Sequence, residues 1–446
     1  MRRACGAIGI LGLTTLIALV ACPTAAREWT PLTDSVSGEA PPSASVVQHD
    51  SNGTLVEVEV PGIVIAEAPG RAGVSIELPG AGRLDRAGLP DLPALSYLLA
   101  IPSTGAVRVE IESLNETTLA GFDVAPAAPF RTDGEPAAKA VASDTYARNA
   151  FYPASPAVLS EPMVFRDLRL VRLEVRPVRV NPATGELRVA TSMTVRVVRD
   201  DAPTVNEKLV HRPWRSSTFE PLYEDLVLNY RDLPRAETRR GSYLVISNDS
   251  FAAQTEALVE WKNQRGVETV LVTLSDIDPT PSAADIHAYI QTAYLTWDNP
   301  PDYVLLVGDA ASGGYGSFPT WYHDGNPADH PYTELEGSDY LPEVIVGRMP
   351  TDSPTETTVA ILKVLSYERD CDAADQGWYE RGLAVAGNYG ASPPPVTPRL
   401  TTLRVREMML DYGYTQVDTV YYPPVTTAAP ISAIMNAGVG IVNYRG

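Results

Sequence analysis

Cysteine is almost absent from this chain, which contains three in 446 residues. Cys5 lies within an N-terminal leader, Cys22 lies near the end of that leader, and Cys371 stands alone in the second half of the chain. Secreted folds that depend on disulfides need several paired cysteines, so disulfides are excluded as the support of this fold. The fold must instead depend on buried apolar surface.

Positive charge is also scarce. Lys and Arg number 35 against 55 Asp and Glu, which gives a formal net charge of -20 at pH 7. Nucleic acids and anionic membranes require a basic face, so we expect neither as a partner. An acidic surface suits a secreted protein and can hold calcium, although solubility alone is sufficient to explain it.

Apolar runs of the ~20 residues that a membrane span requires are missing after the N-terminal leader. Residues 1–26 instead have the composition of a secretory signal peptide. Arg2 and Arg3 form its basic part, and Ile8–Val20 forms its apolar core. We therefore predict an exported protein without a membrane span.

The end of the signal peptide allows a second interpretation. Leu19–Cys22 resembles a lipoprotein box, in which cleavage before Cys22 is followed by attachment of a lipid. Pro23 follows Cys22 directly, so we favour simple cleavage. A lipid anchor at Cys22 is the alternative.

A chain of 446 residues is too long for one hydrophobic core, so two or three domains are expected. After the signal peptide we predict a flexible lead-in at 27–50, a β-rich region at 51–200, a connector at 201–240 and an α/β domain at 241–446. The predicted fold is therefore multidomain, with a β-sandwich-like region before an α/β domain that has a mostly parallel sheet.

The region 51–200 contains short alternating segments separated by Pro and Gly turns, which is typical of a β-sandwich. One hairpin is predicted, in which 168–177 and 187–198 flank the turn Asn181–Gly185. The connector lacks apolar periodicity and ends in the basic stretch Arg235–Arg240. A solvated linker explains this composition. The alternative is a processing site that separates the β-rich region from the α/β domain.

From residue 242 onward, apolar runs alternate with helical patterns. We predict strands at 243–247, 267–274 and 303–307, separated by helices at 251–265 and 282–294. This order predicts a parallel sheet. The second helix begins with a capping box of Ser282 and Asp285. Further elements follow, and the chain ends on a strand at Gly446, as expected for an incomplete domain.

The strand at 303–307 ends at Gly308-Asp309, and a loop rich in Gly, Pro, His and Asp follows to Ser338. Long loops at the carboxyl ends of parallel strands often carry functional groups. Oxygen ligands suited to calcium are found on Asp329, Glu334, Glu336 and Asp339. A solvated acidic loop explains them equally. Zinc is disfavoured, because His323 and His330 occur without an HExxH or CxxC spacing.

A catalytic nucleophile is not evident from the residues. Cys371 follows a predicted helix and has Asp370 and Asp372 beside it, a field that disfavours a thiolate, so we favour a structural role. No GxSxG elbow of a serine hydrolase is present. The residues alone leave the active site undefined.

Several ordered motifs resemble those of the secreted gingipain-type cysteine peptidases. These motifs are Leu305–Asp309, the pair Asp329 and Asp339 with Tyr340–Arg348 behind it, Tyr412–Thr415, and Gly438–Gly446. The β-rich region resembles the pro-domain of that family more loosely, in a GLPxLP turn and an NPxTGE hairpin. The resemblance implies a caspase-like α/β peptidase domain behind a pro-region, in a protein secreted by a bacterium or held at its cell surface.

For activity, the resemblance implies cleavage of polypeptides by a Cys thiolate and a His imidazole. In the family these residues follow the strand end that matches Asn443–Gly446, so both are expected beyond Gly446, and this chain by itself is expected to be inactive. The acidic residue that orients the His has no close match, and Asp324 is the candidate for it. Calcium is predicted as a structural cofactor, bound through Asp329 and Asp339.

The alternative function belongs to another class. A catalytically inactive surface or secretion-system component could keep the same fold as a binding scaffold. A His and a Cys soon after Gly446 favour the peptidase, and their absence favours the scaffold.

Overall fold

The computed structural model describes residues 27–445 apart from short segments, which are 34–37, 51, 69–71, 85, 130–139, 201, 311–315, 371–376, 388–395 and 423–424. The predicted signal peptide, the lipidation site Cys22 and the isolated Cys371 therefore lie outside the described residues. Within the described part, none of the helices is both long and apolar enough to cross a membrane.

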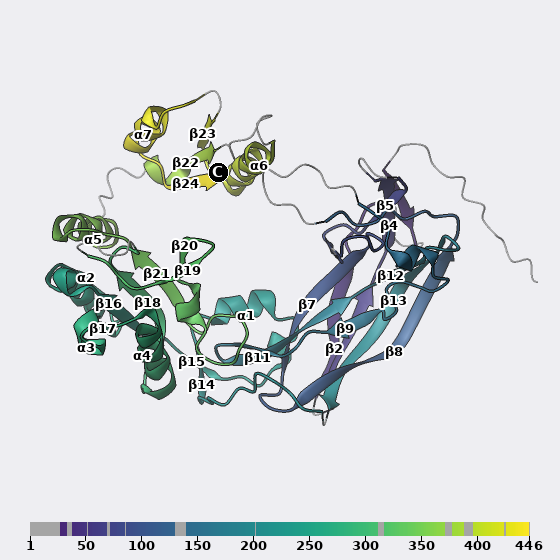
Figure 1. Cartoon of the computed structure of the whole chain (residues 1–446), viewed down its shortest axis with the longest axis horizontal. Coiled ribbons are helices and arrows are strands. Elements are labelled where there is room, and N and C mark those ends of the chain that lie inside the picture. The colour runs from purple at the N-terminus through teal and green to yellow at the C-terminus, as the bar shows by residue number, and fades with distance from the viewer. Residues whose placement is uncertain are drawn as a thin grey trace, which may run out of the picture.

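Two antiparallel sheets pack face to face in the N-terminal half (Figure 1). The first contains β2 (Ser43–Asp50), β3 (Gly53–Glu59), β8 (Ala106–Leu119), β12 (Val178–Asn181) and β13 (Glu186–Asp200). The second contains β6 (Gly82–Arg83), β7 (Pro93–Ile101), β9 (Ala157–Leu159), β10 (Met163–Phe165) and β11 (Leu168–Val175). Val56 and Val195 of the first sheet are buried against Leu99 and Leu173 of the second. This is the packing of a β-sandwich, as the alternating pattern predicts.

The predicted flexible lead-in at 27–50 is wrong, because it contains two paired strands. β1 (Glu28–Pro31) pairs with β4 (Gly62–Glu67), which also pairs with β5 (Val74–Glu77) to form a third sheet. The other strand is β2, which pairs with β3. Since β2 is an edge strand and most of its residues are polar or exposed, the composition does not reveal it.

The predicted hairpin has the correct turn but one wrong strand. The short strand β12 pairs with β13 across the turn Asn181–Gly185. β11 belongs to the other sheet, where it pairs with β7. Pro177 lies between β11 and β12 and cannot donate a ladder hydrogen bond, so the chain leaves one sheet for the other at this point.

The connector at 201–240 is folded, so the interpretation as a solvated linker is wrong for most of its length. It contains β14 (Trp214–Ser216), α1 (Glu220–Leu226) and β15 (Glu237–Arg239), and β14 pairs in parallel with β15. Phe219 and Tyr223 are fully buried and contact Phe165 edge-on. A few aromatic anchors hold this segment, and such anchors leave no periodic pattern. Its last residues, Arg235–Arg240, are all exposed.

A four-stranded parallel sheet follows in the order β17-β16-β18-β21. Its strands are β16 (Ser242–Ser247), β17 (Thr269–Thr273), β18 (Pro301–Val307) and β21 (Ile345–Met349). Its helices are α2 (Ala252–Gln264), α3 (Leu274–Ile277), α4 (Ala283–Thr296) and α5 (Pro354–Glu368). The predicted capping box of Ser282 and Asp285 at the start of α4 is confirmed.

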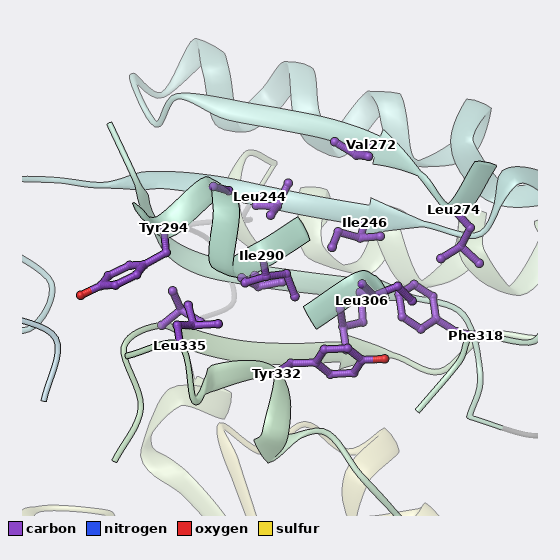
Figure 2. Close-up of a cluster of buried hydrophobic side chains, with 14 residues drawn as sticks. Leu244, Ile246, Val272, Leu274, Ile290, Tyr294, Leu306, Phe318, Tyr332 and Leu335 are labelled. Atoms are coloured by element: carbon purple, nitrogen blue, oxygen red, sulfur yellow. The ribbon is translucent and has the colours of Figure 1, made fainter. Parts of the chain in front are cut away.

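Helices cover both faces of this sheet. On one face Leu244 and Leu306 of the central strands pack against Ile290 of α4 (Figure 2). On the other face Val245 packs with side chains of α2 and α5, such as Ile361. Burial on both faces explains why the central strands are continuous apolar runs rather than alternating ones.

The last strands form a separate parallel sheet in the order β23-β22-β24. It contains β22 (Arg381–Ala386), β23 (Gln416–Tyr421) and β24 (Ile441–Arg445), with α6 (Val396–Tyr412) and α7 (Ala429–Asn436) beside them. Leu383 and Val420 belong to its own small core. The sequence predicts one mostly parallel sheet where the structure has two, because apolar runs do not indicate which strands are neighbours.

Candidate functional site

The carboxyl ends of β16 and β18 meet where the strand order reverses, which is the usual ligand position in an open α/β sheet. Asn248 follows β16 and Gly308-Asp309 follows β18. The Asn248 main-chain nitrogen donates to the oxygen of Val307 (2.9 Å), and its side-chain amide donates to the oxygen of Ser317 (2.8 Å). The two strand ends and the returning loop are thereby bound to one another.

The chain bends at Gly308, where the loop after β18 begins. The φ of Gly308 is +141°, and a Cβ at this position would lie 2.8 Å from the oxygen of Gly316. After this bend the Phe318 nitrogen donates to the oxygen of Asp309 (2.7 Å), while the Asp309 carboxylate accepts from the Ala310 nitrogen (2.8 Å). The predicted strand end is confirmed, and the side chain of Asp309 caps its own turn.

Arg348, near the end of β21, binds the loop to this edge. It donates to both carboxylate oxygens of Asp329, at 2.8 and 2.5 Å, and to the oxygen of Gly308 at 3.0 Å. Burial acts to raise the pKa of Asp329, but the hydrogen bonds and charge of Arg348 outweigh it and lower that pKa below its ordinary value. Asp329 therefore remains ionised and neutralises Arg348.

Asp339, the second predicted calcium ligand, faces the β-rich region instead. Its carboxylate accepts from the nitrogens of Val164 (2.9 Å) and Leu341 (3.0 Å), and burial raises its pKa. Among the described residues, Asp329 and Asp339 share no hydrogen-bonding partner. Across the described residues, no group of three or more His, Cys, Asp or Glu side chains is arranged to hold a metal ion. Calcium stays a prediction.

The other acidic residues of the loop have partners of their own. Glu336 accepts from Lys208 Nζ (2.8 Å) and from the nitrogens of Leu209 and Val210 (2.9 and 3.1 Å). Glu334 lies 3.3 Å from His330 Nε2. Glu336 is thus held by hydrogen bonds to the connector, and Glu334 has His330 as its neighbour.

Asp324, the candidate for orienting a catalytic His, lies at a hairpin turn. The turn joins β19 (Trp321–His323) to β20 (Asn326–Ala328), and Asp324 and Gly325 have φ values of +49° and +79°. Two positive φ values are typical of the tight turns that Asp-Gly pairs form. Asp324 is highly exposed and its carboxylate lies 3.5 Å from His323 Nε2. The turn explains this residue by itself, and its role towards a His stays a prediction.

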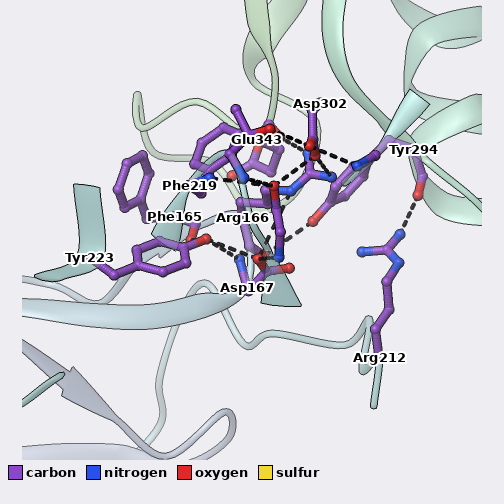
Figure 3. Close-up of polar contacts among 12 residues, drawn as sticks. Phe165, Arg166, Asp167, Arg212, Phe219, Tyr223, Tyr294, Asp302 and Glu343 are labelled. Carbon is purple, nitrogen blue, oxygen red and sulfur yellow. Dashed lines mark hydrogen bonds and ion pairs between the residues drawn. The ribbon is translucent and has the colours of Figure 1, made fainter. Parts of the chain in front are cut away.

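Sequence reasoning missed the contact between the β-rich region and the start of the sheet (Figure 3). Arg166 and Asp302 form a fully buried ion pair with a 2.5 Å separation. Arg166 also donates to the main-chain oxygens of Pro301 (2.8 Å) and Glu343 (2.6 Å), and its guanidinium lies 5.0 Å from the ring centroid of Phe219. The one signal in the sequence is the charged residue Asp302 directly before an apolar run.

Glu343 is a second buried acid at this contact. Its Oε2 accepts from the nitrogens of Leu335 (2.7 Å) and Glu336 (3.1 Å), whereas its Oε1 is buried and has no hydrogen-bond partner among the described residues. Burial raises the pKa of Glu343 to about 8, against the effect of these hydrogen bonds. Glu343 is therefore protonated at neutral pH.

The described residues thus form a rigid strand edge and a polar contact surface, and they do not form a nucleophile–base pair. All three cysteines lie outside the described residues. Of the histidines, His330 Nε2 bonds to the oxygen of Tyr340 (2.9 Å), and His287 Nε2 bonds to that of Glu334 (2.9 Å). Both imidazoles hold the loop in place.

Comparison with known proteins gives two matching families in succession. Propeptide_C25 matches residues 41–226, and Peptidase family C25 matches residues 236–446. Together they span most of the chain, and the interval between them lies inside the connector.

Among curated proteins, gingipain R1 of Porphyromonas gingivalis is 29% identical over 372 residues, which cover 81% of this chain and 36% of the relative. Lys-gingipain of the same organism is 27% identical over 421 residues, which cover 90% of this chain and 23% of the relative. The chain thus spans well under half the length of these relatives. The crystal structure of the Arg-specific cysteine proteinase gingipain R superposes with a TM-score of 0.40 and 28% identity, over 46% of each chain.

Proposed function

We propose that this chain, which belongs to peptidase family C25 and carries the propeptide of that family, is part of the precursor of a secreted, gingipain-like cysteine endopeptidase. The observation that carries the proposal is the order of the two matches along the chain. The second match begins at residue 236, within the exposed stretch Arg235–Arg240, which follows the folded part of the connector.

The proposed reaction is hydrolysis of a polypeptide through an acyl-enzyme. A Cys thiolate attacks the peptide carbonyl, and a His imidazole passes a proton to the leaving amine before water releases the acid. We propose that both residues follow β24, beyond Gly446. The described residues would support this catalytic pair. Arg348 and Asp329 attach the loop after β18 to the carboxyl edge of the four-stranded sheet.

In this proposal the β-rich region is a pro-region that is released after export. It contacts the α/β domain through the Arg166–Asp302 pair and through Asp339, which binds the main chain of β10. Such polar, directional contacts fix the orientation of the two parts. Cleavage within Arg235–Arg240 removes the covalent link, and the two parts are then joined by non-covalent contacts such as these and the Lys208–Glu336 pair.

The test is peptidase activity of the gene product extended beyond Gly446. An unfolded protein such as casein should be cleaved by the extended protein, and iodoacetamide should abolish the cleavage. Residues 27–446 alone serve as the control and should show no thiol-dependent turnover. If the extended protein is folded and also fails to turn over casein under reducing conditions, the binding scaffold becomes the better description.

A further inference from the structure

The carboxylate of Asp302 has four partners in a fully buried position at the start of β18. It accepts hydrogen bonds from Ser216 Oγ (2.8 Å), Thr218 Oγ1 (2.6 Å) and the main-chain nitrogen of Gly241 (2.7 Å). Its fourth partner is the guanidinium of Arg166 at 2.5 Å. A buried carboxylate depends on such partners, because it has lost its hydration.

These partners lie on two sides of the basic stretch Arg235–Arg240. Arg166, Ser216 and Thr218 precede it in the chain, and Gly241 follows it directly. If the connector is cut and the preceding part departs, Asp302 keeps only the nitrogen of Gly241. It also loses the cation that is its ion-pair partner in the described part of the chain.

The main chain of Gly241 lies directly against this carboxylate. The residue is buried, and a Cβ on it would lie 2.4 Å from Asp302 Oδ1 and 2.5 Å from the oxygen of Pro300. Only glycine therefore permits this approach. Arg240, immediately before it, is exposed and offers the side chain that an arginine-specific peptidase recognises.

Near Asp302 the buried carboxylates outnumber the buried cation that faces them, so a second cation would be favourable there. Asp167 is also buried, and its carboxylate lies 3.9 Å from Arg166 Nε, so that one guanidinium faces two carboxylates. The nearby cation Lys208 is already bound to Glu336 at 2.8 Å. An additional positive charge beside Asp302 would balance the group.

We infer that Arg240–Gly241 is the processing bond, and that its hydrolysis creates an N-terminal ammonium on Gly241 that becomes the counter-ion of Asp302. Water adds across the bond: the C–N bond breaks, the water oxygen joins the carbonyl carbon of Arg240, and the Gly241 nitrogen takes up the protons. Arg240 becomes a carboxylate. Asp302 thereby keeps a charged partner from its own domain when Arg166 leaves.

Access to the bond requires β15 to separate from β14 and the buried Gly241 to move away from Asp302 during the cut. The pairing covers three residues on each strand, and an isolated two-stranded pair of this length is a weak restraint. The inference rests on the proposed processing of the connector. It adds the position of the cut and the reason why the new terminus stays bound.

The test uses trypsin, so that it does not depend on any activity of this protein and can fail separately from the proposed function. In the variant R235Q/R239Q, Arg240 is the remaining arginine of the stretch; in the matched variant R239Q/R240Q, it is Arg235. Each is cut in the native state, and its new terminus is identified by mass spectrometry. The reactivity of that terminus with an amine reagent is then compared in buffer and in denaturant at pH 7.

The amine of Gly241 should react at least about tenfold more slowly in the native protein than in denaturant, because an ion-paired ammonium is protonated and shielded. The amine of Ala236 in the matched variant should react at similar rates in both. Asp302→Asn, added to R235Q/R239Q, should remove the protection. If that variant does not fold, the comparison of the amine reactivities of Gly241 and Ala236 still tests the inference.

Two outcomes overturn the inference. One is equal native reactivity of the Gly241 and Ala236 amines. The other is a bond after Arg240 that stays intact in R235Q/R239Q under conditions that cut the matched variant completely after Arg235.

Discussion

Arg166 and Asp302 join the β-rich region to the α/β domain by a buried charge pair (Figure 3). The guanidinium carbon of Arg166 lies beside two aromatic rings, 5.0 Å from the centroid of Phe219 and 5.8 Å from that of Tyr294. A complete buried pair adds little net stability, but removal of one partner leaves a buried charge. We therefore expect the pair to favour one relative orientation of the two parts over others.

Arg166→Met should lower the free energy of unfolding by about 3–5 kcal/mol, because Asp302 is then left buried without its cation. The double variant R166M/D302N should recover part of this loss. Urea unfolding followed by tryptophan fluorescence measures both. The control is R404Q, which breaks a pair that is highly exposed on both sides and should change stability by less than about 1 kcal/mol. Equal effects of R166M and R404Q would contradict the buried-pair account.

Glu343 predicts a pH dependence of stability. Its folded pKa of about 8 lies above its ordinary value of 4.5, so the folded state holds the proton more strongly than the unfolded state. The contribution of this group is complete below about pH 4.5 and is lost as the pH rises through 8.

Glu343→Gln should therefore flatten the fall in stability between pH 5 and 8.5, with the largest gain over the wild type at the alkaline end. Urea unfolding at several pH values measures this, and Glu407→Gln on the exposed side of α6 is the control. A parallel fall in E343Q and the wild type would show that Glu343 does not titrate in this range.

Calcium is predicted to raise the melting temperature through Asp329 and Asp339. Asp339→Ala should abolish the calcium-dependent rise, and Asp324→Asn, an exposed turn residue, should preserve it. The rise itself must be compared, because D339A also removes the acceptor of the Val164 nitrogen and lowers stability without calcium. If calcium does not raise the melting temperature of the wild type, the predicted calcium site is wrong.

At the scale of elements, the end of β18 and the loop that follows it form one bonded unit. Gly308 turns the chain, Arg348 binds the strand end to Asp329, and Asn248 binds the loop to the end of β16. These contacts connect the ends of β16, β18 and β21 to described parts of the loop. A catalytic site built beside this edge would require such support.

Gly308→Ala should destabilise the protein by about 1–3 kcal/mol, because alanine is strained at a positive φ and its Cβ would contact the oxygen of Gly316. Gly347→Ala is the matched control, since that position in β21 has open space around the Cβ and no positive φ. Thermal unfolding of the two variants compares them. Equal stability of G308A and G347A would mean that the turn relaxes freely.

The main helices and parallel strands of the α/β domain were predictable because they leave local patterns, whereas the short hairpin strands β19 and β20 were not. The strand at 303–307 is a continuous apolar run, and the capping box at Ser282 indicates the start of the helix that follows. The edge strand β2 and the aromatic anchors of the connector leave no such pattern. At the candidate site, Gly308-Asp309 could be found for the same reason, whereas the Arg166–Asp302 contact could not, because it joins residues far apart in sequence.

At the scale of the whole molecule, a β-sandwich and an α/β domain meet through the folded connector (Figure 1). The order of propeptide and peptidase matches follows the same division. The net charge of -20 is compatible with export. The central claim is that the first part is a removable pro-region and the second carries the catalytic machinery of the extended protein.

The most direct measurement is a time course of connector cleavage and thiol-dependent casein hydrolysis, made in the same sample of the extended protein. The account predicts little activity before cleavage and a rise that parallels the appearance of new N-termini between residues 236 and 241. Full activity in a variant with Arg235, Arg239 and Arg240 all changed to Gln, and with its connector intact, would contradict it.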